Sequence, residues 1–165
     1  MKRLFALIIC IVLLVPAISF ADGTVAVSTK TIIPKFIEQV VFTCVGDSGG
    51  GTIPNTAITQ QVLAKISGMY LYCVTAYPTS GGTAPDAADV FILNQNSEDL
   101  LGSADNSTAG NGANLIHATL TRTTIPRLYL PGVNFYPVVY GLLTLQVANQ
   151  GTNSAEFTIV LTFVR

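Results

Sequence analysis

Apolar and polar residues alternate with a period of two over most of this chain. Strict alternation is typical of strands with one buried face, because successive side chains point to opposite sides of a sheet. The segments that show it are 24–32, 36–45, 68–77, 89–93, 115–122, 138–148 and 155–164. Clusters of Gly, Pro and Asn separate them, and no amphipathic helix of three turns is evident. The pattern predicts an all-β fold, a single antiparallel β-sandwich or partly closed barrel of about 8–10 strands.

Three segments carry more specific expectations. Segment 36–45 is apolar on both faces, which indicates a central strand. Segment 155–164 alternates cleanly, and we expect it to pair inside a sheet, because a free edge this apolar would invite aggregation. Segment 57–66 fits either one short helix or an edge strand, and its pattern slightly favours the strand.

In segment 68–77, Met69, Leu71 and Cys73 alternate with Tyr70, Tyr72 and Val74. The simple reading puts Cys73 on the face of Leu71 and Val74 on the face of the tyrosines.

The N-terminus has the pattern of an export signal. Lys2 and Arg3 precede an apolar run from Leu4 to Val15, and Ser19-Phe20-Ala21 forms a small-x-small cleavage site. The run of 12 residues is short for a bilayer core of about 30 Å, so a retained anchor is the weaker alternative. We expect a signal peptide at 1–21 and one exported domain at 22–165, with no stable membrane span after cleavage. Its location would be periplasmic, extracellular or virion-associated.

Few residues of the expected mature chain are charged. Without Lys2 and Arg3, six of the eight basic residues remain against nine acidic ones, a net charge of −3. This balance offers no basic patch and argues against nucleic-acid binding. Charged residues are 10% of the chain, against about 25% in an average domain. A surface so poor in charge resists self-association weakly, which favours an assembled subunit.

Two cysteines follow the expected cleavage site. An even count in an oxidising compartment favours a disulfide between Cys44 and Cys73. The alternative is two thiols that act as small apolar residues. The bond requires the two residues to be neighbours in space, since both lie in strand-like segments.

Ser48 lies in Gly46-Asp47-Ser48-Gly49-Gly50, which is similar to the nucleophile motif of chymotrypsin-type proteases. In that family the histidine and the aspartate both precede the serine, whereas the sole histidine here, His117, follows it. The order Ser48, Asp99, His117 matches α/β-hydrolases, but their alternating helices are missing. We expect no catalytic residues, and a hydrolase using Ser48 is only a remote alternative.

Oxygen ligands occur together in the segment 94–99. It departs from a calcium loop at Asn94, where Asp is wanted, and at Ser97, where Gly is wanted, so a hairpin tip held by Asn side chains is favoured. With one histidine and no metal-ligand spacing at the cysteines, we expect neither a metal nor a cofactor.

Tyr70 and Tyr72 share one face of a strand, and they suggest a binding surface together with Tyr77. Later tyrosines could lie near: Tyr129, Tyr136 and Tyr140. Tyrosines of this kind contact protein partners or stack on sugars. The alternative is ordinary cross-strand packing. A second candidate surface is the small, polar segment 102–114.

Several short segments resemble small, uncharacterised β-rich proteins encoded in bacteriophage and prophage genomes. The similar stretches are Ile53-Pro54-Asn55-Thr56, Gly68-Met69-Tyr70-Leu71, Tyr77-Pro78, Gly82-Thr83-Ala84-Pro85, Asp89-Val90-Phe91-Ile92, Asp99-Leu100-Leu101-Gly102 and Gly141-Leu142-Leu143-Thr144-Leu145. They cover about half of the expected mature chain and include no catalytic motif. The resemblance implies a phage-encoded or virion-associated exported protein and no particular reaction.

The sequence therefore predicts an exported, non-catalytic structural or accessory subunit that acts by self-assembly or by contact with a protein partner. The alternative is a secreted binding module for a glycan or a cell-surface protein.

Overall fold

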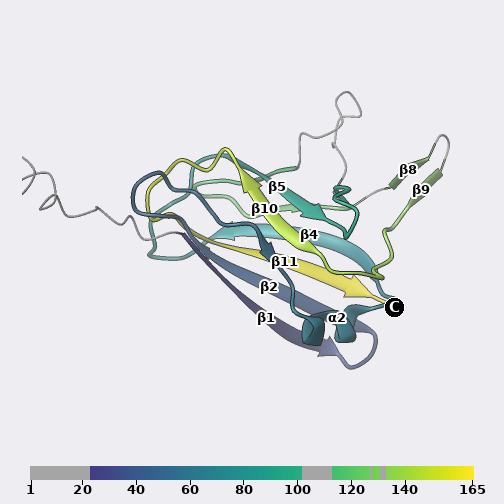
Figure 1. Ribbon diagram of the computed structural model, residues 1–165. Coiled ribbons are helices and arrows are strands. Elements are labelled where there is room, and N and C mark those ends of the chain that lie inside the picture. The colour runs from purple at the N-terminus through teal and green to yellow at the C-terminus, as the bar shows by residue number, and fades with distance from the viewer. Residues whose placement is uncertain (1–22, 102–112, 127, 131–132) are drawn as a thin grey trace, which may run out of the picture.

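The computed structural model describes residues 23–101, 113–126, 128–130 and 133–165. The predicted signal peptide lies outside these ranges. Two antiparallel sheets pack face to face (Figure 1), which confirms the all-β sandwich.

The larger sheet has five strands in the order β1-β2-β11-β4-β7. Their bounds are β1 Thr24–Ile33, β2 Ile37–Val45, β11 Glu156–Val164, β4 Tyr70–Pro78 and β7 Arg122–Thr124. The smaller sheet has the order β3-β10-β5-β6. Its strands are β3 Thr56–Ala57, β10 Thr144–Ala148, β5 Ala88–Leu93 and β6 Ala113–Ile116. A separate hairpin joins β8 Leu128–Leu130 to β9 Val133–Phe135, and the helix α2 spans Gln60–Ile66.

The two strands with the clearest sequence patterns lie where the patterns predict. β2 is central, between β1 and β11, and β11 is central, between β2 and β4. β11 pairs over its whole length with β2, from Glu156 opposite Val45 to Val164 opposite Ile37. The apolar C-terminal strand is therefore paired on both sides, as expected from the cost of a free apolar edge.

Segment 57–66 is mainly helical, so our preference for a strand was wrong. Thr59 caps the helix by accepting a hydrogen bond on its side chain from the N–H of Val62 at 3.3 Å. Val62 and Ile66, four residues apart, are the buried pair on one side of α2. A cap and an i, i+4 apolar pair are enough to define a helix of 7 residues against a core.

Two segments that alternate in sequence are not continuous strands. In segment 115–122, β6 ends at Ile116 and the chain crosses to the other sheet to form β7. In segment 138–148 only β10, from Thr144, is a strand of the smaller sheet. Before it, Val138 pairs with Tyr70 in the larger sheet, and Gly141 lies so close to the Gln95 side chain that a Cβ would displace it. Both segments therefore pass from one layer to the other.

A β-bulge in β4 reverses the predicted faces of that strand. Cys73 pairs with Thr162 and Leu71 pairs with Phe163, so Tyr72 is an extra residue with no partner on β11. Leu71, Val74 and Ala76 are all buried, and they point into the sandwich. The prediction that Cys73 shares the face of Leu71, with Val74 opposite, was therefore wrong. One inserted residue exchanges the faces of all that follows.

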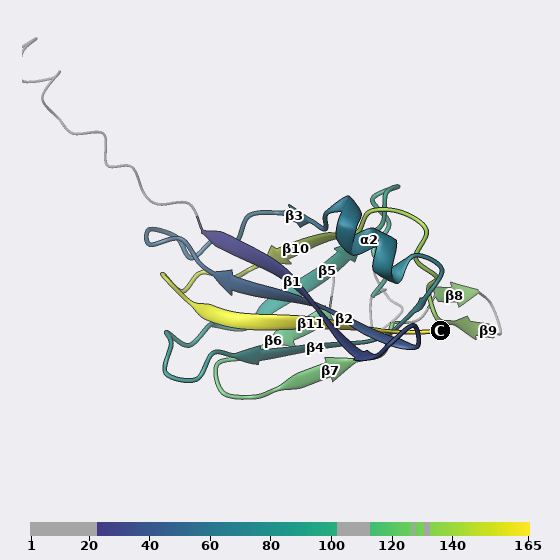
Figure 2. The same cartoon turned by 90° about the horizontal axis from the view of Figure 1, so that it is seen from below.

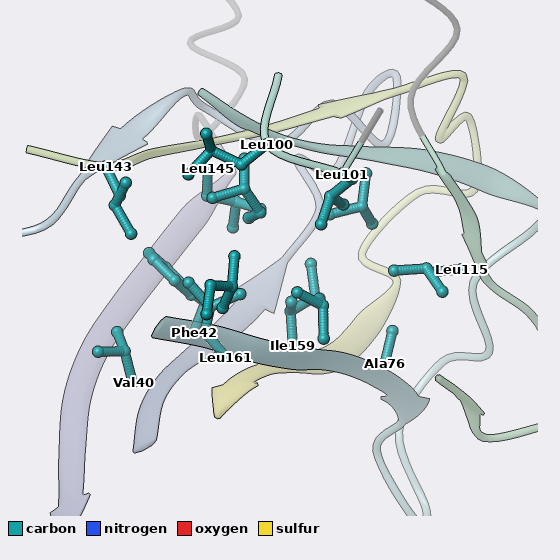
Figure 3. Close-up of a cluster of buried hydrophobic side chains, with 14 of the residues drawn as sticks. Val40, Phe42, Ala76, Leu100, Leu101, Leu115, Leu143, Leu145, Ile159 and Leu161 are labelled. Atoms are coloured by element: carbon teal, nitrogen blue, oxygen red, sulfur yellow. The ribbon is translucent and has the colours of Figure 1, made fainter. Parts of the chain in front are cut away.

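The core lies between the two sheets (Figure 3). Val40, Phe42, Ala76, Ile159 and Leu161 point inward from the larger sheet, and five residues face them from the other layer: Leu100, Leu101, Leu115, Leu143 and Leu145. Burying each Leu, Ile or Phe side chain contributes about 1.5–3 kcal/mol. No helix among the described residues is long and apolar enough to cross a bilayer.

Candidate interaction surface

The side of the five-stranded sheet that points away from the core forms a broad open face. We call this side the outer face. On the three inner strands its residues alternate with buried residues or pair with residues that do: Ile37, Gln39, Val41, Thr43, Val45, Glu156, Thr158, Val160, Thr162, Val164, Tyr70, Cys73, Thr75 and Tyr77. In Figure 2, which views the molecule from this side, no strand of the smaller sheet lies in front of β11 or β4. Most of these side chains are threonine or valine.

Charge is confined to the two ends of the outer face in the described part of the chain. Lys30 pairs with Gln39 at one end, and Glu156 pairs with Val45 at the other. Between them, polar side chains are tied to one another. The Thr75 and Thr123 hydroxyls are 2.9 Å apart, and the Gln39 amide donates to the Thr162 hydroxyl at 3.2 Å. Such cross-strand bonds hold the face in one arrangement and leave it almost uncharged.

The structure places all three predicted tyrosines on this side of β4 but separates them. Tyr70 and Tyr72 are each 44% exposed, close to one end of the strand. Tyr77 lies five residues beyond Tyr72, about 16 Å along the strand. The predicted surface is therefore a pair of tyrosines at one end and a single tyrosine at the other.

A fourth tyrosine, Tyr136, joins Tyr70 and Tyr72 at their end of the strand. The rings of Tyr72 and Tyr136 stack with centroids 5.7 Å apart and an interplanar angle of 30°. Tyr136 reaches this place because the next residues run beside the start of β4, where the Leu71 N–H donates to the Pro137 carbonyl at 2.9 Å. Nothing in the sequence distinguishes Tyr136 from the other late tyrosines, since this pairing joins segments more than 60 residues apart. The stacked rings and Tyr70 form an aromatic cluster on the outer face.

An apolar row crosses the sheet at the level of Tyr70. Successive pairings join residues that are all apolar or aromatic: Ile33, Ile37, Val164, Tyr70 and Val138. The row runs from the β1–β2 turn to the segment after Tyr136. It makes this end of the outer face distinctly more apolar than the threonine-rich centre.

The structure does not contain the expected disulfide: Cys44 and Cys73 are both free thiols. Cys44 pairs with Phe157, a buried residue, and points into the core, whereas Cys73 pairs with Thr162 on the outer face. The central strand β11 lies between them. Their partners on β11 are five residues apart, which is about 16 Å, far beyond the roughly 7 Å that a disulfide can span between Cα atoms.

Asp47 organises the glycine-rich loop that contains Ser48. Its carboxylate accepts hydrogen bonds from the N–H groups of Gly49 and Gly50, both at 2.6 Å, and from the N–H and hydroxyl of Thr52. These donors, the Thr52 hydroxyl first, hold the pKa of Asp47 well below its usual range. Gly51 has a φ of 71° against the Thr152 backbone, where a side chain would not fit. The glycine-rich loop is therefore a turn organised around the Asp47 carboxylate.

Asp99 and His117 do not come together. Asp99 forms a bridge with Leu93 at the end of β5, and its carboxylate accepts from the N–H groups of Ile92 at 3.0 Å and Leu101 at 3.1 Å. Ile116, the neighbour of His117, pairs with Ala88 at the start of that strand. His117 Nδ1 accepts from the Thr119 N–H at 3.2 Å within its own turn. Asp99 therefore does not lie beside His117, as the aspartate of a Ser-His-Asp triad would.

The segment 94–99 is a turn held by its own side chains. Asn94 Oδ1 accepts from the N–H groups of Asn96 at 2.9 Å and Glu98 at 3.0 Å, and its amide donates to the Glu98 carboxylate at 2.7 Å. This is the hairpin tip that the sequence favours over a calcium loop. In the described ranges, no group of three or more His, Cys, Asp or Glu side chains is arranged to hold a metal ion. The second candidate surface, the segment 102–114, lies almost entirely outside the described residues.

Comparison with protein-family models, with curated proteins and with solved structures found no match to this chain.

Proposed function

We propose that this protein is an exported, non-catalytic structural or accessory subunit that acts by protein contact through the outer face of its five-stranded sheet. The observation that carries the proposal is the nearly uncharged outer face with the stacked Tyr72 and Tyr136. The cores of protein interfaces are depleted in charge and enriched in tyrosine, and this face has both properties.

The edge of the same sheet adds support. β1 is an edge strand of 10 residues with Lys30 as its single charged residue. Edge strands usually carry more protection, because their free backbone groups pair readily with another chain. A second copy of this chain is therefore the partner that we favour. The export signal and the resemblance to phage-encoded proteins further favour a virion-associated or other extracellular assembly.

Size-exclusion chromatography with light scattering tests the proposal. The natural protein should form a defined oligomer, and Val160→Glu, at the centre of the outer face, should convert it to a monomer. Gln146→Glu is the matched control, because Gln146 lies on β10, on the far side of the smaller sheet. A natural protein that stays monomeric at high concentration and binds no protein from its source would contradict the proposal.

A glycan-binding module is the second candidate, because stacked tyrosine rings can also hold a sugar ring. A monomer that is retained on a glycan array and released by Tyr72→Ala would favour this candidate. Loss of a measured hydrolysis on Ser48→Ala would instead support the enzyme alternative.

A further inference from the structure

The turn between β1 and β2 exposes three large apolar side chains within five residues. Ile32 is 44% exposed, Ile33 48% and Phe36 61%. Turns are normally built from small or polar residues, so this composition needs an explanation. Both views place the turn at the same end of the molecule as the C-terminus, away from the core (Figures 1 and 2).

Two backbone hydrogen bonds hold this turn within the protein. The Phe36 N–H donates to the Ile33 carbonyl at 3.0 Å, and the Phe36 carbonyl accepts from the Arg165 N–H at 3.1 Å. Pro34 has no N–H to satisfy. Unpaired backbone groups make entry into hydrocarbon costly, and these bonds and Pro34 lower their number in the turn.

Positive charge surrounds the exposed side chains of Ile32, Ile33 and Phe36, which we call the apolar tip. Lys30 precedes the tip and Lys35 lies within it, between Ile33 and Phe36. The Lys65 ammonium donates to the Thr29 hydroxyl at 2.7 Å on the same edge of the sandwich. The nearest carboxylate in the strand, Glu38, is only 8% exposed and accepts from the Thr31 hydroxyl at 2.7 Å.

The other described acidic side chains lie elsewhere. Asp47 follows the last residue of β2 and Glu156 is the first residue of β11, so both lie at the end of the sheet far from the β1–β2 turn. Asp86 and Asp89 are at the start of β5. Glu98 and Asp99 belong to the turn after β5 in the smaller sheet, where Glu98 binds Asn94. The tip is therefore locally cationic although the expected mature chain is acidic.

Tyrosines lie behind the tip on the same face. Tyr70 belongs to the apolar row that begins at Ile33, and Tyr72 stacks on Tyr136 next to it. Apolar residues at a tip, lysines beside them and tyrosines behind them match the layers of a membrane surface, where tyrosine collects at the level of the headgroups.

We propose that the β1–β2 turn inserts into the surface of an anionic lipid bilayer. Ile32, Ile33 and Phe36 enter the boundary of the acyl chains, and Lys30 and Lys35 lie among the phosphates, extending their ammonium groups to them. A protein partner fits the tip less well, since a convex turn of three side chains is small beside the roughly 800 Å² per partner of a stable interface. This inference goes beyond the proposed protein contact, because Ile32, Ile33 and Phe36 lie at the β1–β2 turn, but it shares Tyr70 and the stacked Tyr72 and Tyr136 with the outer face.

Vesicle sedimentation of the exported protein tests the insertion. The protein should bind vesicles of phosphatidylcholine with phosphatidylglycerol and leave those of phosphatidylcholine alone. Replacing Ile33 and Phe36 together by serine should weaken binding about tenfold or more. Leu120→Ser is the matched control, because Leu120 is 52% exposed near the opposite end of the sandwich, and it should bind as the natural protein does. Replacing Lys30 and Lys35 by glutamine should remove the preference for anionic lipid.

The absence of tryptophan from the chain allows a second readout. A tryptophan introduced by Phe36→Trp should shift its emission to shorter wavelength with anionic vesicles, whereas one introduced by Leu120→Trp should not. The inference is overturned if the natural protein does not bind anionic vesicles at low salt, if the Leu120 variants respond as the tip variants do, or if the Phe36→Trp emission stays unchanged. Dissociation of an oligomer by the tip variants, without vesicle binding, would show that the tip is a protein contact instead.

Discussion

Cys44 and Cys73 lie on opposite faces of one sheet, with the whole width of β11 between them. Their environments differ accordingly. Cys44 is completely buried beside Phe157, and this burial raises the pKa of its thiol to about 12. Cys73 lies on the partly exposed outer face. Since the thiolate is the reactive form of cysteine, the two thiols should react at very different rates with an alkylating reagent.

In the expected mature chain, which lacks Cys10, we expect a thiol reagent to modify one cysteine of the native protein at pH 8, and that cysteine should be Cys73. Modification of Cys44 should require denaturant. Mass spectrometry of peptides after alkylation, with and without urea, measures both sites, and Cys73→Ser is the control that should abolish native labelling. A mass two units lower without labelling at either site would instead demonstrate the disulfide.

The Asp47 loop predicts a loss of stability in acid. The folded-state pKa of Asp47 is lower than the unfolded value of about 3.9, so its carboxylate stabilises the fold above that pH and ceases to do so as pH falls. The melting temperature should therefore fall below about pH 4 more steeply in the natural protein than in Asp47→Asn. Equal slopes for the two proteins between pH 7 and pH 2 would contradict the assignment.

Asp99 predicts the opposite dependence of stability on pH. Burial raises the pKa of this carboxyl above its unfolded value, so the folded state favours the protonated form. Its contribution to stability is greatest below about pH 3.9 and declines as pH rises to the folded-state pKa. Asp99→Asn should remove this decline, because the amide oxygen can accept the Ile92 and Leu101 N–H groups without charge.

A second substitution separates charge from hydrogen bonding at that site. Asp99→Ala should cost about 1–3 kcal/mol in urea unfolding at neutral pH, because it leaves the two N–H groups without their acceptor. If Asp99→Ala were as stable as Asp99→Asn, these hydrogen bonds would contribute nothing measurable.

The central strand predicts where the core is most sensitive. Phe157 is fully buried on β11, and Phe157→Ala should lower the free energy of unfolding by about 3–5 kcal/mol. Thr43→Ala, on the outer face of the adjoining strand, should change it by no more than about 0.5 kcal/mol. Urea unfolding followed by circular dichroism measures both, and similar losses would contradict the assignment of inner and outer faces.

The sequence predicts the sandwich and its central strands because their patterns record burial directly. The apolar character of both faces of β2 indicates its central position, and the alternation of β11 specifies which of its faces is buried. The hairpin tip at Asn94 was also predictable, since an Asn side chain can replace a backbone partner within its own turn.

The sequence-based predictions fail where contacts between distant segments override the local alternation of side chains. The bulge at Tyr72 depends on β11, which is about 90 residues away, and it moves Cys73 to the outer face. The alternation before Thr144 continues while the chain leaves one sheet for the other, so it records burial but not the sheet that provides it. The contact between Tyr72 and Tyr136 has no local signal of any kind.

The position of β11 also governs the order of assembly. β2 and β4 have no direct pairing, and each depends on a strand that the ribosome adds more than 75 residues after Pro78. The larger sheet therefore cannot close until β11 has been made, and β2 and β4 stay unconnected until then. A secretion channel threads an open chain, so a topology that delays closure of the sheet is compatible with the export that we propose.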